Sequence, residues 1–321
     1  MKHVVTRRAL VAAAAPALFV PGARAQGAYP SQPIKVVHGY AAGSNPDTIA
    51  RHMAPALTEI LGVPIVVDPK PGAAERLAAA QVAKAPADGY TLYMMTGGQA
   101  VVSATDPALP YDLAKEFAFI SLVTRFPFNF VVPADSRFKT FKDFVDEAKA
   151  RPGKLSYGSS GIGSTLHMAM ELLRARVGID VVHVPYRGGL AQPLADLTTG
   201  QLDIHVSTLT LTMQLVRAGK LRALVVTSKE RSRFAPDVPA IAETVPDFDV
   251  VSWLGYAAPA GLPAAVTDKL AAAIRQTAER PEVKAKLEEL GNDVLADGPA
   301  PFRARVMSDL AKWKPLAHAV K

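Results

Sequence analysis

Residues 155–177, LSYGSSGIGSTLHMAMELLRARV, contain a predicted strand, a glycine-rich loop and a predicted helix in direct succession. The strand is predicted at 155–157. The helix is predicted at 165–177, because apolar residues recur there at the spacing of one helical face: Leu166, Ala169, Met170 and Leu173. A strand that leads through a glycine turn into a helix is the unit of a parallel sheet covered by helices. This stretch therefore predicts an α/β fold.

The same alternation of strands and helices extends in both directions from this stretch. Before it, strands are predicted at 34–37, 65–67, 91–95 and 130–132, with helices at 46–61, 73–84 and 141–150. After it, strands are predicted at 181–184, 204–206 and 223–226, and a longer one at 250–257. The chain from 264 onward is predicted to be mostly helical, with a break at Gly291 and a short strand at 293–295. This pattern predicts two α/β sheets in one chain.

Two apolar segments are predicted to cross between the sheets. Residues 121–133 are apolar with no good turn signal apart from Pro127, and residues 247–257 are similar. Two crossings favour one lobe built from both ends of the mature chain and a second built from its middle. We expect lobe 1 to comprise residues 26–127 and 250–321, and lobe 2 to comprise residues 128–249. The hinge is expected near 126–130 and 249–253.

The N-terminal segment is predicted to be a signal peptide at residues 1–25. It begins with Lys2, Arg7 and Arg8, and its apolar run at 9–20 is shorter than the roughly 20 residues that span a bilayer. The small-x-small pattern Ala23-Arg24-Ala25 follows, so the mature chain is expected to begin at Gln26, in the periplasm. Residues 6–10 also resemble a twin-arginine signal, and both the Sec and the twin-arginine routes stay open.

Charge and cysteine content exclude several classes of function. The net charge is +7, and four of these charges are basic residues of the signal segment, which leaves about +3. The remaining basic residues are dispersed and are not interleaved with aromatic residues, so nucleic-acid binding is not expected. The chain has no cysteine, which excludes disulfides, thiolate metal sites and cysteine nucleophiles.

Three glycine-containing turns each follow a predicted strand and precede a predicted helix. Ligands bind in open parallel sheets beyond the carboxyl ends of the strands. The turn at 39–47 could admit an anion to a helix N-terminus, or could simply cap the helix. The turn at 157–165 nearly matches a P-loop, but Ser164 stands where the lysine is needed, so nucleotide hydrolysis is not expected. Its N–H groups and hydroxyls remain suited to a carboxylate.

The third turn lies at 184–189. Arg187 could grip a carboxylate with two hydrogen bonds, or could be an exposed, solvated side chain. The backbone N–H groups of Gly188 and Gly189 are the better candidates.

Catalytic patterns are missing, and we expect no enzyme, metal or cofactor. Ser159 and Ser160 suggest a hydrolase, but the G-x-S-x-G elbow is not formed because Ile162 occupies its last position. No base is placed beside either serine. The histidines lack metal-ligand spacing, and the carboxylates are scattered.

These loops, in this order, resemble the substrate-binding proteins of the tripartite tricarboxylate transporters, often called the Bug family. The resemblance extends over nearly the whole mature chain. Its most specific stretches are His183-Val184-Pro185-Tyr186-Arg187-Gly188, Gly200-Gln201-Leu202-Asp203 and Ala218-Gly219-Lys220-Leu221-Arg222-Ala223-Leu224. Further matches are found at 29–34, 47–51, 88–92, 109–112, 150–155, 237–239 and 258–263.

The resemblance implies a type II periplasmic-binding-protein fold, with two α/β lobes joined by a two-crossing hinge and a small carboxylate as ligand. It implies a membrane transporter as partner; a periplasmic sensor subunit that serves a signalling receptor is the alternative. A monomer is expected. The ligand-binding residues it implies, together with those of the third turn, are Ala42, Gly43, Asp47, Thr96, Gly97, Ser159, Gly161, Gly163, Ser164, Thr165, Arg187, Gly188, Asp203 and Ser207.

Two departures from the family pattern bear on the ligand. The family usually has an R-P-G-A-G-G-N-like stretch after its second strand, where this chain has Lys70-Pro71-Gly72-Ala73-Ala74-Glu75-Arg76. The family often has an acidic residue shortly after the Asp203 match, where this chain has Ser207 and Thr208. The second departure favours a plain carboxylate over an amino-bearing ligand.

Overall fold

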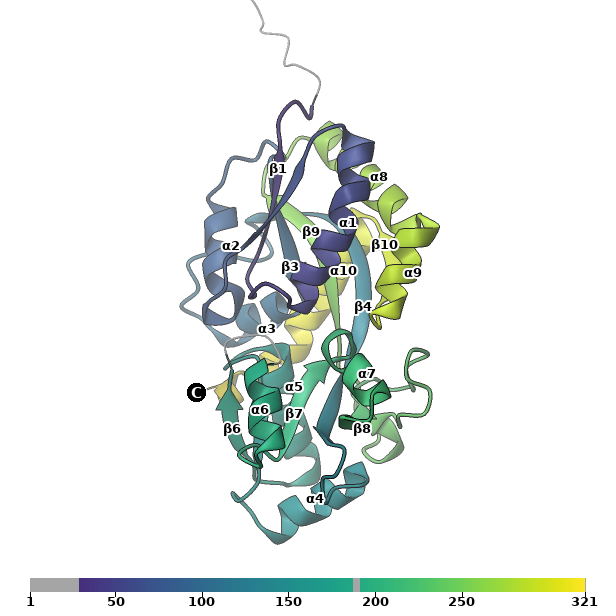
Figure 1. Ribbon diagram of the computed structural model, residues 1–321. Helices are drawn as coiled ribbons and strands as arrows, with labels where there is room; N and C mark the ends of the chain where they lie inside the picture. The colour runs from purple at the N-terminus through teal and green to yellow at the C-terminus, as the bar shows by residue number, and fades with distance from the viewer. Residues whose placement is uncertain (1–28, 187–190, 321) are drawn as a thin grey trace, which may run out of the picture.

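The computed structural model describes residues 29–186 and 191–320 (Figure 1). The predicted signal peptide and Gln26 lie outside these ranges, as do Arg187, Gly188 and Gly189 of the third glycine turn. Within the described ranges, every helix is too short or too polar to cross a membrane.

The first sheet combines both ends of the described chain. Its order is β2-β1-β3-β9-β4, and β10 also pairs with β4. β1 is parallel to β2 and β3, whereas β9 is antiparallel to β3 and β4. The strands are β1 Ile34–His38, β2 Ile65–Pro69, β3 Thr91–Thr96, β4 Phe117–Pro133, β9 Val251–Pro259 and β10 Asp293–Asp297.

The second sheet is built from the middle of the chain. Its order is β6-β5-β7-β4, and β8 also pairs with β4. β5 is parallel to both β6 and β7, as the strand–loop–helix pattern predicts. The strands are β5 Ser156–Ser159, β6 Val182–Pro185, β7 Ile204–Thr208 and β8 Leu221–Val226.

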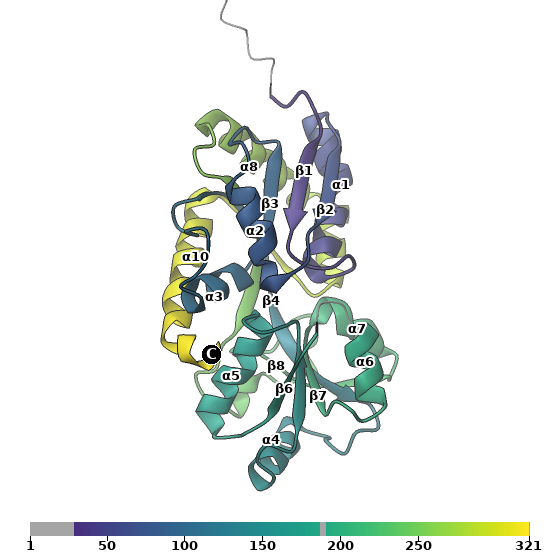
Figure 2. The same cartoon turned by 90° about the vertical axis from the view of Figure 1, so that its left-hand side faces the viewer.

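Helices cover both sheets, and the two halves are stacked end to end (Figures 1 and 2). The first half contains α1 Asn45–Leu61, α2 Arg76–Ala83, α3 Gly98–Thr105, α8 Ala264–Glu279, α9 Pro281–Glu289 and α10 Pro299–Trp313. The second half contains α4 Phe141–Ala150, α5 Thr165–Val177, α6 Ala191–Thr198 and α7 Leu209–Arg217. Large side chains such as Trp253 and Phe144 are fully buried beneath these helices.

Strand β4 belongs to both sheets. Its residues up to Pro127 pair with β9, and from Phe128 onward they pair with β7 and β8. The second passage between the halves lies beside the first, because Thr227 contacts both. The N–H of Phe128 donates to Oγ1 of Thr227 (2.8 Å), and this hydroxyl donates to the carbonyl of Val250 (2.6 Å).

The segment 73–84 differs from the single predicted helix. Ala73, Ala74 and Glu75 have φ values of 47°, 49° and 72°, and only the residues from Arg76 form an α-helix. Positive φ cannot continue a right-handed helix, and it costs a non-glycine residue of the order of 1 kcal/mol or more. A second difference is helix α3, which is present in the structure but was not predicted from the sequence.

Candidate functional site

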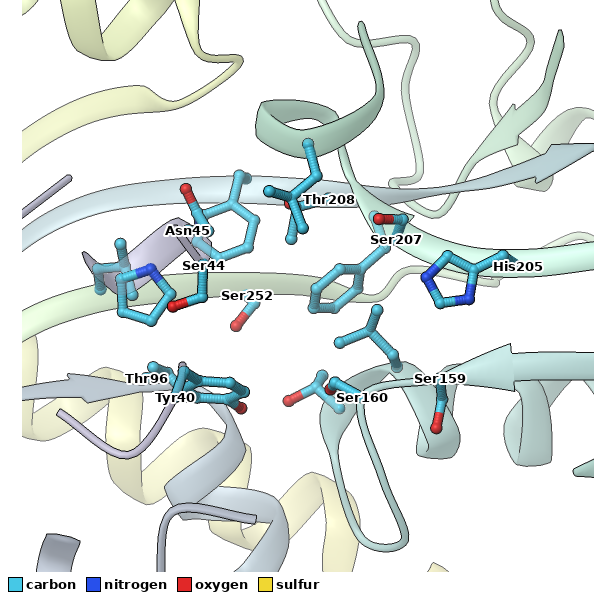
Figure 3. Close-up of a pocket in the computed structure, with 17 residues that line it drawn as sticks. Tyr40, Ser44, Asn45, Thr96, Ser159, Ser160, His205, Ser207, Thr208 and Ser252 are labelled. Carbon is cyan, nitrogen blue, oxygen red and sulfur yellow. The ribbon is translucent and has the colours of Figure 1, made fainter. Parts of the chain in front are cut away.

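A cavity of about 70 Å³ lies where the two halves meet (Figure 3). Its walls come from the first half, from the second half and from the crossing strand β4. The lining residues are Tyr40, Ser44, Asn45, Pro46, Thr96, Phe126, Phe128, Ser159, Ser160, Thr165, Leu166, His205, Ser207, Thr208, Leu211, Ser252 and Leu254. The cavity therefore depends on the position of one half relative to the other.

The first glycine loop is shaped from behind by Asp47. Its Oδ2 accepts hydrogen bonds from the N–H of Gly43 (2.9 Å) and from Nε of Arg51 (2.9 Å), and its Oδ1 lies 3.1 Å from Nε2 of His38. Burial opposes ionisation, but the hydrogen bonds from Arg51, Gly43 and His38 outweigh it and lower the pKa of Asp47. The Asp47 carboxylate is thus fully engaged, and the structure places Asp47, Ala42 and Gly43 outside the cavity lining.

The second glycine loop uses two of its glycine N–H groups internally. The N–H of Gly161 donates to Oγ of Ser159 (3.2 Å), and that of Gly163 donates to Nδ1 of His167 (3.2 Å). Ser164 caps α5, because its Oγ accepts from the N–H of His167 (3.2 Å). Of the residues predicted in this loop, Ser159 and Thr165 reach the cavity and Gly161 lines the wider cleft outside it, whereas Gly163 and Ser164 support the loop from behind.

The two ends of β7 have different roles. Ser207 and Thr208 form its carboxyl end and line the cavity, as does Thr96 at the end of β3. Asp203 precedes the strand and lies at the other end, where it accepts from the N–H of Ser156 (2.9 Å) and from Nη2 of Arg137 (3.0 Å). The structure does not bring Asp203 to the cavity.

Gly97 follows Thr96 and contacts the cavity wall from behind. Its N–H donates to the carbonyl of Trp253 (3.1 Å), and a Cβ at this position would lie 2.7 Å from Oγ of Ser252, a lining residue. A side chain at 97 would therefore displace Ser252.

Six buried polar atoms of the lining have no hydrogen-bond partner among the described residues. They come from both halves: Ser44 Oγ, Asn45 Nδ2, Ser160 Oγ, His205 Nδ1, Ser207 Oγ and Thr208 Oγ1. A buried polar group without a partner costs about 1–3 kcal/mol. Burial also lowers the pKa of His205 to about 4, so its imidazole is neutral at pH 7. The cavity is therefore built to hydrogen-bond a polar molecule.

Electrostatic attraction in this cavity comes from helix ends and not from charged side chains. The described residues that line it include no lysine or arginine. Helices α1 and α5 both begin at the cavity, and the first N–H groups of a helix lack intrahelical acceptors and carry partial positive charge. Such ends bind carboxylates and phosphates.

Apolar side chains complete the walls. The rings of Phe126 and Phe128 lie on either side of the β4 partner change, with their centroids 5.8 Å apart and their planes at 89°. Leu166, Leu211 and Leu254 add aliphatic surface. A molecule that fits this cavity therefore combines acceptor groups with an apolar body.

The expectation that no base lies beside the loop serines is wrong for Ser159. Its Oγ lies 2.6 Å from Nε2 of His183. Parallel pairing of β5 with β6 places His183 opposite Tyr157, and Ser159, two residues further along β5, faces the same side of the sheet. However, burial, with further contributions from His167 and Arg174, lowers the pKa of His183 to about 3. An imidazole of such low basicity is a poor general base at neutral pH. No cluster of three metal-ligating side chains occurs within residues 29–186 and 191–320.

A wider cleft of about 880 Å³ continues outward from the cavity. Tyr40 and Ser160 line both spaces and stand at their junction. Leu77 and Ile162 lie at the outer cleft with 60% and 55% of their surface exposed. Apolar surface therefore extends from the cavity to solvent.

Several lining residues were missed by the sequence analysis. Tyr40, Ser44 and Asn45 lie inside the first glycine loop that it singled out, but it chose their neighbours. Phe126 and Phe128 lie in the predicted crossing, so a ligand between two lobes could have pointed to them. No local signal marks His205 or Ser252.

Comparisons with known proteins identify relatives along most of the chain. A family model described as "Tripartite tricarboxylate transporter family receptor" matches residues 49–321. A Pseudomonas sp. (strain P51) protein, "UPF0065 protein in tcbD-tcbE intergenic region", is 35% identical over 316 residues, covering 97% of this chain and 94% of the relative.

Solved structures give the same result. The periplasmic binding protein BugD is 30% identical with a TM-score of 0.85, covering 91% of this chain and 98% of BugD. MatC from Rhodopseudomonas palustris, solved with bound malate, is 29% identical with a TM-score of 0.84, covering 90% and 100%. A second R. palustris protein, solved with adipate, is 30% identical with a TM-score of 0.85, covering 91% and 98%.

Proposed function

Because the chain belongs to the tripartite tricarboxylate transporter receptor family, we propose that it captures a small carboxylate between its two lobes and delivers it to a membrane transporter. The resemblance predicted from the loop motifs is confirmed, and so is the predicted α/β fold of periplasmic binding proteins. The observation that carries the proposal is the cavity, in which helix N-termini and unpaired polar side chains from both halves converge.

A carboxylate can accept hydrogen bonds from the donors that line the cavity. Its two oxygens accept several hydrogen bonds, and each bond to a charged group contributes about 1.5–3 kcal/mol. We propose that Ser160 and Thr165 of the second glycine loop and Ser207 and Thr208 of β7 supply hydroxyls, with the first N–H groups of α5 beside them. The malate and adipate in the solved neighbours are both dicarboxylates, which supports this ligand class.

The predicted loop residues then divide into three groups. Thr96, Ser159, Thr165 and Ser207 are proposed to face the ligand. Gly161 lines the wider cleft, and the others are proposed to shape the walls from behind: Ala42, Gly43, Asp47, Gly97, Gly163 and Ser164. Arg187 and Gly188 remain candidates outside the described residues.

We propose that lobe 1 (26–127 and 250–321) and lobe 2 (128–249) close on the ligand about the two crossings. The change of β4 partners between Pro127 and Phe128 supports this division. A ligand that contacts both lobes stabilises the closed form. The protein is proposed to act as a monomer in the periplasm after cleavage behind Ala25, and to catalyse no reaction.

The test is direct titration of small acids. Purified protein, first analysed by native mass spectrometry for a co-purified acid, is titrated in a calorimeter with malate, succinate, adipate and benzoate. Tight one-to-one binding of at least one acid, with no binding of matched amides, supports the proposal. Absence of binding to every acid, with no co-purified acid, contradicts it. Scattering with and without the acid that binds then tests lobe closure.

A further inference from the structure

Glu75 lies directly behind the lobe 1 wall of the cavity. Its side chain is fully buried, and its Oε2 accepts a hydrogen bond from the hydroxyl of Tyr93 (3.0 Å). Its Oε1 accepts from the hydroxyl of Thr96, and the hydroxyl of Tyr40 is hydrogen-bonded to the same carboxyl group. Tyr40 and Thr96 both line the cavity, where Figure 3 shows them side by side. Glu75 is therefore one hydrogen bond away from two side chains of the cavity wall.

The surroundings of Glu75 are built around its side chain. A Cβ at Gly39 would lie 2.5 Å from Cα of Glu75, and a Cβ at Gly98 would collide with Oε1. The residue also has a left-handed backbone, as do Ala73 and Ala74 before it. Such conformations persist only where the surrounding structure enforces them, and they cluster at ligand clamps.

No described cation forms an ion pair with Glu75. The titratable groups that face it are phenols: Tyr40 from the loop after β1, Tyr93 from β3, and more distantly Tyr111. The guanidinium of neighbouring Arg76 is paired with Asp106 (2.9 Å). Burial raises the pKa of Glu75 to about 7, although hydrogen bonds from Thr96, Tyr40 and Tyr93 oppose the rise. Both charge states of this carboxyl are thus accessible near neutral pH.

The charge state of Glu75 decides whether the hydroxyls of Tyr40 and Thr96 present a hydrogen or only lone pairs to the cavity. Each hydroxyl has one hydrogen, and Oγ1 of Thr96 already accepts from the N–H of Gly98 (3.0 Å). When Glu75 is ionised, the hydroxyls of Tyr40 and Thr96 both donate to it, and only their oxygen lone pairs face the cavity. When Glu75 is protonated on Oε1, the oxygen that otherwise accepts from Thr96, it donates one hydrogen bond itself and releases one hydroxyl hydrogen of the wall to turn towards the cavity.

An anionic ligand interacts differently with these two walls. Oxygen lone pairs backed by a buried negative charge repel a carboxylate, whereas a hydroxyl hydrogen backed by a neutral carboxyl binds it. We propose that Glu75 is a positioning residue of this cavity and that a carboxylate is bound together with one proton, which is taken from solvent and held on Glu75. This inference rests on the proposed carboxylate function.

The test measures proton uptake by the wild-type protein. Adipate and malate are titrated calorimetrically from pH 6 to 8.5, in pairs of buffers with different ionisation enthalpies. Proton uptake is expected to rise from near zero at pH 6 towards one per bound acid at pH 8.5. By linkage, the association constant should fall by up to tenfold per pH unit above about pH 7. The buried histidines do not produce a rise towards pH 8.5, because burial lowers the pKa of His38, His167, His183 and His205 and so moves their titration away from the alkaline end of the range.

Variants separate this role from a purely structural one. Glu75→Gln keeps the shape and imitates the neutral carboxyl, so its affinity should be independent of pH and at pH 8.5 at least tenfold higher than that of the wild type. Glu75→Gly, which suits the left-handed backbone, should also lose proton uptake if Glu75→Gln does not fold. Glu59→Gln on the exposed face of α1 is the matched control and should retain the wild-type profile.

The outcomes are distinct. Binding of either acid without proton uptake, or with uptake retained in Glu75→Gln or Glu75→Gly, overturns the role of Glu75 and leaves the proposed function intact. Failure of the wild type to bind any acid of the panel overturns the proposed function, and the role of Glu75 with it.

Discussion

The hydroxyl of Thr210 lies 2.7 Å from Oδ1 of Asn45, and this contact joins the start of α7 to the start of α1. The same hydroxyl lies 2.7 Å from the carbonyl of Leu290 and accepts from Nδ2 of Asn292 (3.2 Å). Asn45 lines the cavity, and its Nδ2 has no partner among the described residues. A ligand that accepts from Asn45 would therefore extend a hydrogen-bond network that already connects the two lobes.

Thr210→Val should weaken ligand binding without contacting the ligand. The closed arrangement loses one hydrogen bond of about 0.5–1.5 kcal/mol, so affinity for the acid that binds best should fall by roughly two- to tenfold. Calorimetry measures the change. Thr267→Val on α8, whose hydroxyl bonds only to a local carbonyl, is the control and should bind normally. Equal affinity of both variants would show that this contact does not stabilise the bound form.

Ser160→Ala and Ser164→Ala should separate binding from stability. The Ser160 hydroxyl is unpaired and lines the cavity, so its loss should weaken binding about tenfold or more with little change in stability. Ser164 caps α5, so its loss should lower the free energy of unfolding by about 1 kcal/mol. Titration and urea denaturation of both variants measure the two effects. If Ser164→Ala weakened binding and Ser160→Ala lowered stability, the ligand contact would be assigned to Ser164 instead.

Thr227→Val should destabilise the junction of the two crossings. The change removes the acceptor of the Phe128 N–H and the donor to the Val250 carbonyl, both buried. The free energy of unfolding should fall by about 1–3 kcal/mol. Thr227→Ser retains the hydroxyl and should lose much less. Denaturation curves for the three proteins decide the matter, and a larger loss in Thr227→Ser than in Thr227→Val would point to the methyl group, which only the valine variant retains.

Asp47→Asn should destabilise the protein in a pH-dependent way. The pKa of Asp47 is lowered in the folded protein, so ionisation adds stability above the unfolded pKa of about 4, and this stability is lost as pH falls through the folded pKa. The wild type should therefore have a higher Tm than Asp47→Asn at pH 7, and the difference should shrink below about pH 4. A difference that stays constant from pH 7 to pH 3 would mean that the charge of Asp47 contributes nothing.

Ser159 should resist serine-directed reagents. Its partner His183 has a pKa of about 3, lowered chiefly by burial. The imidazole is therefore too weak a base to activate the Ser159 hydroxyl as a nucleophile. Incubation with a fluorophosphonate at pH 7–8, followed by intact-mass analysis, should leave the protein unmodified while trypsin reacts fully in parallel. Stoichiometric labelling at Ser159 would instead reveal an activated nucleophile.

Local patterns in the sequence were sufficient for most elements and for the fold. The apolar spacing at 165–177 and the glycine turn before it predicted β5, the loop and α5, since periodicity and left-handed glycines act over a few residues. The helix predicted to start at Ala73 was wrong for the opposite reason, because Ala73, Ala74 and Glu75 hold left-handed backbones that their residue types disfavour.

The exact set of residues around the cavity was not available from local patterns. Asp203 directly precedes β7 and Ser207 lies near its carboxyl end, and the rule that ligands lie at carboxyl ends could have favoured Ser207 alone. No such rule places His183 beside Ser159, Glu75 behind Tyr40 or Thr210 against Asn45. These meetings depend on the pairing of strands and on how the two lobes pack.

The sequence by itself thus determined the succession of strands and helices, the glycine turns and the family. The tertiary structure alone decided which side chains share one cavity, and that Glu75 is buried behind it. The physical reason is the distance along the chain between the residues that interact. Helical periodicity and turn conformation are set by neighbours within a few residues, whereas the contact between Asn45 and Thr210 joins positions 165 residues apart and results from packing of the whole chain.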